Sequence, residues 1–441
     1  MASSAPIPKR ILAAYGAPTL GLSFGLFFVQ FYFLKFATDV LLVAPALMGW
    51  IFAAAKLYDA ISNPLIGSAS DRTRSRFGRR APWLIGALPV LVASFAVLWA
   101  PPSGLEGTPL ALWSAAGLVL FYTAFALYAV PHAALGAELS DDSHERTRIF
   151  GARQLGMTAG MMGAFVAMHF AMNAPDRRAA ASAVALPAIA AAALLLAIPA
   201  VFVRAPRSEA VRGGASLARA LRDVWVNRPA RLLLVVQLVE AIGAGSVGVM
   251  APFVTEYWMG RPELVAVLPA AYVVAGIASI PIWVWLSRLF GKRDTWLVSM
   301  TLAALAFAGL FFAGGQVRPT IALLVLAGIA MGAGGVLGSS ILADVIDLDE
   351  HATGERKEGI YSAAMAFMLK LGTSFATAAS GLVLAAAGFA PNAVQSAESL
   401  FGIRILFAGF PCVGFALGAL LFTRFALAPR PAATAPAVQL F

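Results

Sequence analysis

The sequence predicts an all-α membrane protein in which twelve transmembrane helices form two pseudo-symmetric six-helix bundles. Of its 441 residues 60% are hydrophobic and only 12% are charged, whereas roughly 25% are charged in a soluble domain. The apolar residues gather in runs long enough to cross roughly 30 Å of hydrocarbon. A short basic motif also recurs in the second half of the chain, which indicates two repeats of the same orientation.

The apolar runs divide the chain into two sets of six. We expect one bundle within 1–203 and another within 230–426, joined by a cytoplasmic linker at 204–229 and followed by a cytoplasmic tail at 427–441. The linker contains a candidate amphipathic helix near Leu217–Val226. The expected spans are 13–38, 45–69, 82–101, 110–137, 149–172, 179–203, 231–256, 263–287, 294–314, 319–346, 359–388 and 400–425.

The basic residues predict the orientation of these spans. With both termini in the cytoplasm, 23 lysines and arginines fall in cytoplasmic loops and tails and 4 fall on the opposite side. Cytoplasmic loops of membrane proteins carry such an excess. The formal charge of +10 therefore indicates membrane orientation, and no nucleic-acid partner is expected. The protein is expected to lie in a lipid bilayer.

A repeated loop motif predicts how the halves are related. Phe77-Gly78-Arg79-Arg80, followed by Trp83, recurs as Phe290-Gly291-Lys292-Arg293, followed by Trp296. The offset is constant, and each copy follows the second span of its half. Two parallel halves related by an axis along the membrane normal place a solute site between them, near the middle of the bilayer.

The second span carries the most informative polar residues. On a helix, Lys56, Asp59, Ser62 and Asn63 share one face. A carboxylate within an apolar span is costly unless it faces a partner or a water-filled cavity. Asp59 is therefore a candidate functional residue, and Lys56 is its nearest candidate partner in sequence.

These residues resemble the glycoside-pentoside-hexuronide:cation symporters of the major facilitator superfamily, a family that includes the melibiose permease. The resemblance covers nearly the whole chain. It is carried by Asp59-Ala60 with Pro64 and Gly67, by the loops at 71–83 and 145–146, and by the segments 281–293 and 343–359. It implies the major facilitator fold and a protein that is not an enzyme and needs no cofactor. The alanine- and arginine-rich composition indicates a bacterial inner membrane, and we expect a monomer.

The resemblance also implies a cation site. Asp59 and Lys370 match family positions at or near the coupling cation, and Lys56, Ser62 and Asn63 lie beside Asp59 on its helix. Asn63 stands where sodium-coupled sugar carriers commonly have a second acid. Oxygens of Ser62, Asn63 and either Thr373 or Ser374 are candidate sodium ligands, whereas a proton needs only one carboxyl. Sodium and proton therefore both remain candidates for the coupling ion.

The solute class is less clearly indicated. The family relationship implies symport of a small polar glycoside, pentoside or hexuronide by alternating access. The sugar-binding acids of the melibiose permease are absent, since Leu22, Ser23, Ala129 and Ala133 occupy the corresponding region. A lysolipid or other amphiphile is the alternative solute. Candidate cavity residues are Arg153, which matches a family arginine, and Gln30, Tyr32, Tyr128, His132, Glu240 and Tyr361.

Several of these polar residues have a second interpretation. Glu240 is equally consistent with pairing to a lysine of the other half, and His132 with a hydrogen bond inside its bundle. Lys35 lines the cavity or extends outward to the membrane surface. The glycines at 156, 160 and 163, and at 332–338, are expected to allow close helix packing.

The cytoplasmic loops predict a gate and raise one other function class. We expect ion pairs of Asp71 with Arg72 and Arg79, and of Asp344 or Asp347 with Arg356, to hold the outward-facing state. A membrane enzyme would require histidines and acids clustered near one membrane face. His144 and His351 lie in or beside acidic loops, so such clusters are present in the sequence. Arginines crowd both loops, however, and the family resemblance accounts for them. A transporter is therefore expected and an enzyme is not.

Overall fold

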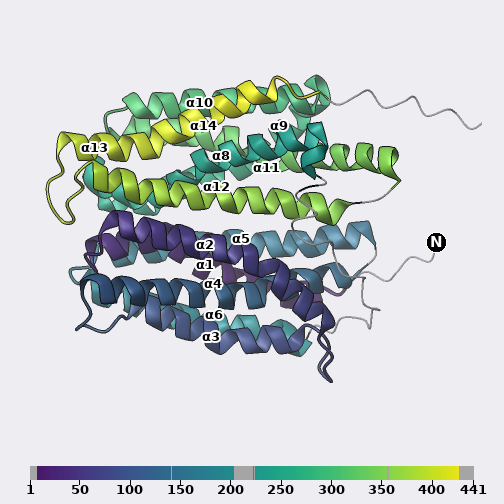
Figure 1. Ribbon diagram of the computed structural model, residues 1–441, viewed down its shortest axis with the longest axis horizontal. Coiled ribbons are helices and arrows are strands. Elements are labelled where there is room, and N and C mark those ends of the chain that lie inside the picture. The colour runs from purple at the N-terminus through teal and green to yellow at the C-terminus, as the bar shows by residue number, and fades with distance from the viewer. Residues whose placement is uncertain (1–6, 141, 203–221, 223, 355–356, 427–441) are drawn as a thin grey trace, which may run out of the picture.

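The computed structural model describes residues 7–140, 142–202, 222, 224–354 and 357–426. This part of the chain forms long helices in two stacked bundles, with the N-terminal half in purple and blue and the C-terminal half in teal to yellow (Figure 1). The proposed tail and six of the ten residues of the helix proposed at Leu217–Val226 lie outside the described residues.

The helices of the N-terminal half follow the predicted spans closely. They are α1 (Lys9–Asp39), α2 (Pro45–Arg72), α3 (Ala81–Trp99), α4 (Gly107–Glu138), α5 (Ser143–Met172) and α6 (Arg177–Phe202). Aromatic side chains fill the centre of this bundle, where Trp99 packs against Phe28, Tyr32, Phe33 and Phe36. Burial of such apolar surface within a tightly packed bundle fixes the relative positions of the helices.

The C-terminal half contains interrupted helices. It consists of α8 (Arg228–Phe253) with a π-helical end η1 (Val254–Trp258), η2 (Pro262–Val265), α9 (Val267–Phe290), α10 (Lys292–Phe312), α11 (Val317–Thr353), α12 (Glu358–Ala386), α13 (Ala397–Arg404), the π turn η3 (Ile405–Gly409) and α14 (Phe410–Phe422). Short π segments commonly occur at functional sites. Here η1 presents Glu256 and Tyr257 to the N-terminal half.

Eleven helices of the described part are long and apolar enough to cross a membrane. The remaining long helix, α2, has 28 residues and packs against α4 and α12, but polar and charged residues interrupt its apolar run. With η1, η2 and the pieces of the last helix joined to their neighbours, this gives the twelve predicted spans.

The two halves repeat one packing plan. In the N-terminal half α1 packs on α5 and α6, α3 on α4 and α6, and α2 on α4. In the C-terminal half α8 packs on α12 and α14, α10 on α11 and α14, and α9 on α11. The glycine of the repeated loop motif has a similar φ angle in both halves. Gly78 and Gly291 have φ angles of 91° and 81°, a region that glycine adopts without strain.

Two ends of the bundle are distinguished by their loops. We call the end with the loop at 73–80 and with Leu139 and Lys357 the basic end. The end with the loops at 40–44, 100–106, 173–176 and 387–396 is called the opposite end. Contacts between the halves are made chiefly by α2 with α12 and by α1 with α8. All four helices run between the two ends, so their approach determines which end is closed.

Glycines allow α2 and α12 to meet near the opposite end. A Cβ atom on Gly381 would lie 2.3 Å from the carbonyl oxygen of Pro45 and 2.8 Å from Cα of Gly49. Backbone atoms cannot move aside as a flexible side chain can. The absence of a side chain at Gly381 is therefore required for the halves to meet as they do here.

We expect Gly381→Ala to shift the protein towards a conformation that is open at the opposite end. The added methyl group clashes only where α2 and α12 touch, so the folded bundles themselves are little affected. The shift is measured as a longer distance between spin labels at Ser103 and Val394, which are exposed on the two halves, in a Cys412→Ser background. Gly86→Ala is the matched control, because its Cβ meets nothing within 4 Å. An unchanged distance in Gly381→Ala would contradict the expectation.

Candidate coupling site and solute cavity

An ion pair joins the halves midway along α2 and α12. The Lys370 ammonium lies 2.5 Å from Oδ2 of Asp59, whose side chain is 7% exposed. The partner of Asp59 is therefore Lys370 of the other half, and the expectation that Lys56 would pair with it is wrong for this conformation. The sequence could not show this, because 311 residues separate the two side chains.

Asn63 completes the contacts of this pair. In the amide orientation that satisfies both of its polar atoms, Asn63 donates to Oδ1 of Asp59 at 3.2 Å and accepts a hydrogen bond from the Lys370 ammonium. Its carbonyl oxygen is thus a neutral ligand for whatever cation lies beside Asp59. The Ser62 hydroxyl instead donates to the backbone oxygen of Asp59, so it is engaged within the helix.

Lys56 lies on the same interface but in different contacts. Its ammonium group donates to the Thr377 hydroxyl at 2.9 Å and lies 5.1 Å from the centre of the Phe52 ring. The residue is 6% exposed. In the described residues, Lys56 has no carboxylate within ion-pair distance. The interface therefore holds two lysines and one aspartate in a poorly solvated place.

The geometry of this site is that of a carboxylate already occupied by a cation. The Lys370 ammonium takes the position beside Asp59 that a sodium ion would take, and Asn63 contacts both groups. Separating the pair without a replacement would leave two buried charges, which is strongly unfavourable. Opening this pair therefore requires new partners for both Asp59 and Lys370.

A cavity of about 210 Å³ lies beside this pair, between the halves. It is formed by α1, α5, α8, α9, α11, α12 and η3. Leu369 and Thr373 line it from α12 and flank Lys370 in sequence. Only three of the lining residues carry a polar side-chain group: Gln30, Tyr272 and Thr373.

Among the seven predicted cavity residues, Gln30 alone lines this cavity in the described structure. Tyr32 lies in the aromatic cluster around Trp99, and Arg153 is half-buried on α5. Tyr361 is 1% exposed and accepts a hydrogen bond from Asn227. These residues were chosen because polar groups are scarce in the spans, but most of them serve packing or hydrogen bonds within one half.

Tyr128 and His132 also belong to the interior of the N-terminal half. The His132 ring stacks on Tyr15 with centroids 4.4 Å apart, and its Nε2 lies 3.0 Å from the backbone oxygen of Tyr15. Tyr128 donates to the backbone oxygen of Leu196. Of the two interpretations of His132, the hydrogen-bonded histidine describes this conformation.

Glu240 is not among the residues that line this cavity. It lines a separate small space with Ser299 and Met300 of α10 and Phe415 of α14. The expected pairing with a lysine of the other half is not found in the described residues, because these neighbours all belong to the C-terminal half.

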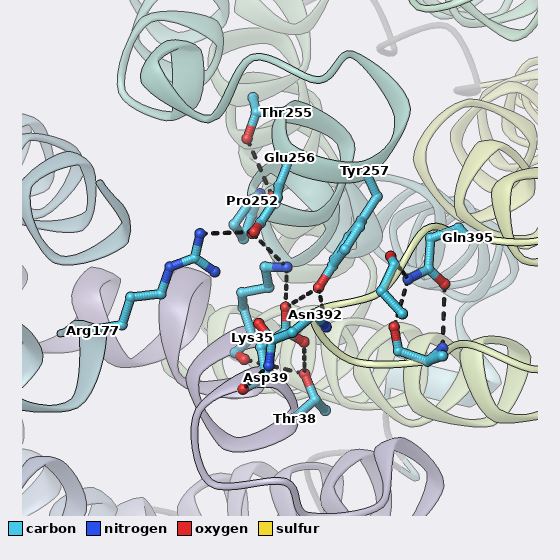
Figure 2. A network of polar contacts seen from close by, with 12 residues as sticks. Lys35, Thr38, Asp39, Arg177, Pro252, Thr255, Glu256, Tyr257, Asn392 and Gln395 are labelled. Carbon is cyan, nitrogen blue, oxygen red and sulfur yellow. Dashed lines mark hydrogen bonds and ion pairs between the residues drawn. The ribbon is translucent and has the colours of Figure 1, made fainter. Parts of the chain in front are cut away.

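A network of charged side chains closes the opposite end between the halves (Figure 2). The Lys35 ammonium pairs with Asp39 on its own helix and lies 2.8 Å from Glu256 of η1. Arg177 also lies 2.8 Å from Glu256, and the Tyr257 hydroxyl donates to Asp39 at 2.5 Å. Lys35 therefore neither lines the cavity nor extends outward to the membrane surface. It forms part of a lock between α1 and η1.

The loop at 387–396 extends this network. Asn392 donates through its side chain to the backbone oxygen of Asp39 at 2.6 Å, and its backbone nitrogen donates to the Tyr257 hydroxyl. Sequence reasoning did not find this cluster. Its signal was present as a lysine and an aspartate one helical turn apart at the end of the first span, with an acid at the end of the seventh.

The ion pairs described at the basic end stay within one half. Arg80 pairs with Asp71 at 2.6 Å and with Glu138 at 2.7 Å, and Lys292 pairs with Asp344 at 2.6 Å. Arg79 contacts Glu138, so the predicted pairs of Asp71 with Arg72 and Arg79 are replaced by one with Arg80. The predicted partner Arg356 lies outside the described residues, and no contact of Asp347 with it is described.

In both halves the repeated basic loop thus binds an acid near the end of the fourth helix of that half. Glu138 ends α4, and Asp344 lies in the last turns of α11. The pairing anchors the loop that follows the second helix of each half. The structure is therefore closed at the opposite end, with the described ion pairs of the basic end holding each half together separately.

Comparison with known proteins agrees with this architecture. Residues 14–428 match the family described as MFS/sugar transport protein. Curated relatives include an inner membrane symporter, YicJ, of Escherichia coli, with 27% identity over 90% of this chain and 87% of the relative. The isoprimeverose transporter of Lactiplantibacillus pentosus is also 27% identical, over 90% of this chain and 84% of the relative.

Two further likenesses bear on the fold and the family. A glucuronide carrier protein homolog of Escherichia coli is 25% identical over 92% of this chain and 90% of the relative. The inward-facing, unoccupied structure of a bacterial homolog of the human lysosomal transporter Spinster superposes with a TM-score of 0.71 at 14% identity, covering 97% of this chain and all of that chain. The chain belongs to the MFS/sugar transport protein family and is a multi-pass membrane transporter of the major facilitator superfamily, akin to the glycoside-pentoside-hexuronide:cation symporters.

Proposed function

We propose that the protein couples a proton or sodium ion to the symport of a small sugar-derived solute by alternating access, with Asp59 as the cation site. The observation that carries this proposal is the Asp59–Lys370 ion pair between the halves, beside the cavity. The relatives named as symporters, an isoprimeverose transporter and a glucuronide carrier support the solute class.

The charges at the interface favour an anionic solute, such as a hexuronide. Lys370 is 29% exposed in its side chain and adjoins two cavity-lining residues, so a solute carboxylate has access to it. Such a carboxylate provides Lys370 with a new partner and leaves Asp59 free for the cation. Each ligand then increases the affinity for the other, as thermodynamic linkage requires.

The apolar cavity lining favours a second candidate, a lysolipid or other amphiphile. With three polar side chains around about 210 Å³, the cavity accommodates an alkyl chain more readily than a neutral sugar. Sugar hydroxyls left without partners cost roughly 1 to 3 kcal/mol each. This consideration weighs least against a hexuronide, whose carboxylate binds outside the apolar part of the cavity.

Uptake into proteoliposomes distinguishes these solutes. We expect an imposed proton or sodium gradient to drive accumulation of a radiolabelled glucuronide more strongly than that of a neutral xyloside. Accumulation of lysophosphatidylcholine alone would support the amphiphile, and absence of cation-driven accumulation for all three probes would contradict symport of either class.

Lys370→Gln is expected to make solute affinity independent of the cation. Without the lysine, solute and cation no longer share an interaction partner, and a coupling of about 5- to 150-fold, typical of linked sites, is lost. Solute affinity is measured by thermal shift with and without sodium, and at two pH values. Lys56→Gln is the matched control, because it removes the same charge but leaves the ion pair intact. Persistent cation dependence in Lys370→Gln would refute the shared-lysine mechanism.

We further propose that the basic end faces the cytoplasm of a bacterial inner membrane, with both termini on that side. The 23 to 4 distribution of basic residues supports this orientation. The end that is closed in the described conformation then faces away from the cytoplasm. Labelling of cysteines placed at Phe77 and Val394, both exposed, by an impermeant reagent in intact cells tests the orientation: only the second is expected to react.

A further inference from the structure

Glu240 has a buried carboxyl group that the coupling site does not use. It lies halfway along α8, and the residue is 7% exposed. In the described part of the chain its carboxyl group has no ion pair, no hydrogen bond and no charged group close enough to interact with it. Buried polar groups in proteins are almost always paired, so this exception calls for an explanation.

A small cavity of about 10 Å³ adjoins the carboxyl group, roughly the space of one water molecule. Gly418 of α14 makes room for the side chain, since a Cβ there would lie 3.3 Å from Cγ of Glu240. The Ser299 hydroxyl, which also lines the cavity, donates to the backbone oxygen of Trp296. The site is thus shaped to hold a carboxyl group without supplying a counter-charge.

The titratable groups of the surrounding helices leave Glu240 isolated. Tyr272 of α9 interacts with it electrostatically and is neutral, and the thiol of Cys412 lies on α14. The charged groups of α10 are in its first turn, about two turns from Ser299. Those of α11 lie at its ends, with Arg318 at the opposite end and the others at the basic end. Lys370 of α12 is paired with Asp59, and Lys35 and Asp39 of α1, like the acids of η1 and η2, lie at the opposite end.

Burial without a partner disfavours the charged form of a carboxyl group strongly, whereas the protonated form is tolerated. We propose that Glu240 is a proton-binding site of the C-terminal half, separate from Asp59 and occupied in the conformation described here. A proton is the ligand that this site fits, because the space admits one small species and the neighbours offer too few oxygens for a metal cation.

The position of α8 links this site to the solute cavity. Glu240 contacts the small space next to α10 and α14, while Ala244, one helical turn further along α8, lines the solute cavity. Tyr272 lines the cavity too. A movement of α8 that accompanies solute binding or alternating access alters the packing around Glu240, admits water and releases the proton. The proton site is thereby sensitive to the same motion that moves the solute.

Infrared spectroscopy of the purified full-length protein tests the site without requiring a substrate. At about pH 7 exposed carboxyl groups are ionised, so the carbonyl band of a protonated carboxyl reports buried acids only. We expect this band in the wild type and in Asp59→Asn, and its loss in Glu240→Gln, which is isosteric. When the cells that produce the wild-type protein are grown with carbon-13 glutamate, the band is expected to shift. This shift identifies the group as a glutamate even if Glu240→Gln folds poorly. No band, or one that carbon-13 glutamate leaves in place, would overturn the proposal.

A second measurement tests the link to conformation. In the wild type, raising the pH until the carbonyl band of Glu240 disappears is expected to lengthen the distance between spin labels at Ser103 and Val394. In Glu240→Gln the short distance is expected at every pH, whereas Asp59→Asn retains the pH dependence. The same pH dependence in Glu240→Gln and the wild type would refute the link. Both measurements are independent of solute transport, so either can fail while the proposed symport stands, and the reverse.

Discussion

Asp59→Asn is expected to abolish cation-driven accumulation of solute while solute exchange continues. Asparagine has the same shape but no charge, so it neither binds a cation tightly nor holds Lys370 in an ion pair. With a tenfold cation gradient, wild-type protein coupled one to one accumulates solute about tenfold, whereas the variant only equilibrates it. Uptake and counterflow of a radiolabelled glucuronide in proteoliposomes measure the two activities separately.

The matched control for this variant is Asp71→Asn. It makes the same chemical change on the same helix, but Asp71 is 49% exposed at the basic end and paired with Arg80. Coupled accumulation is expected to persist in it, because the cation site is untouched. Accumulation against a gradient by Asp59→Asn would show that the coupling cation binds elsewhere.

Glu256→Gln is expected to open the opposite end. The change removes the acid that Lys35 of α1 and Arg177 of α6 share, and it leaves both cations with fewer partners in the closed state. Lost partners of buried polar groups cost about 1 to 3 kcal/mol, which shifts the balance between closed and open states about 5- to 150-fold. Asp39 still holds Lys35, so the lower part of this range applies.

The shift is measured as a longer distance between the labels at Ser103 and Val394, at the opposite end. Glu263→Gln serves as the control, because its pair with Arg261 is exposed and lies within the C-terminal half; exposed pairs contribute little. If Glu256→Gln leaves the labels as close as in the wild type, the network does not hold the halves together.

The sequence predicted the fold well because its signals are local. Length and apolarity of each run set the spans, and the recurrence of Phe77-Gly78-Arg79-Arg80 at 290–293 set the relation of the halves. Glycine positions were informative for the same reason: Gly160 packs so close to α1 that a Cβ would lie 2.1 Å from the Leu20 carbonyl oxygen. Gly335 is an exception, since a Cβ there meets nothing within 4 Å.

The partners within the site were much less predictable. Sequence spacing suggested Lys56 for Asp59, but the nearest cation comes from α12, because the packing of the halves rather than the helical repeat decides the contact. The family resemblance, by contrast, indicated Lys370 correctly as a neighbour. The sequence offered no reason to assign a role to Glu256, because acids are common at the ends of spans. Its pairing with Lys35 becomes visible only when α1 is placed beside η1.

The charge movement that accompanies cation binding tests the central claim most directly. Purified protein in vesicles adsorbed on a solid support is given a jump in sodium concentration or in pH, with no solute present. The account predicts a transient current for one of these ions in the wild type and in Asp71→Asn, and its loss in Asp59→Asn. A transient of unchanged size in Asp59→Asn would contradict the assignment of the cation to this carboxylate.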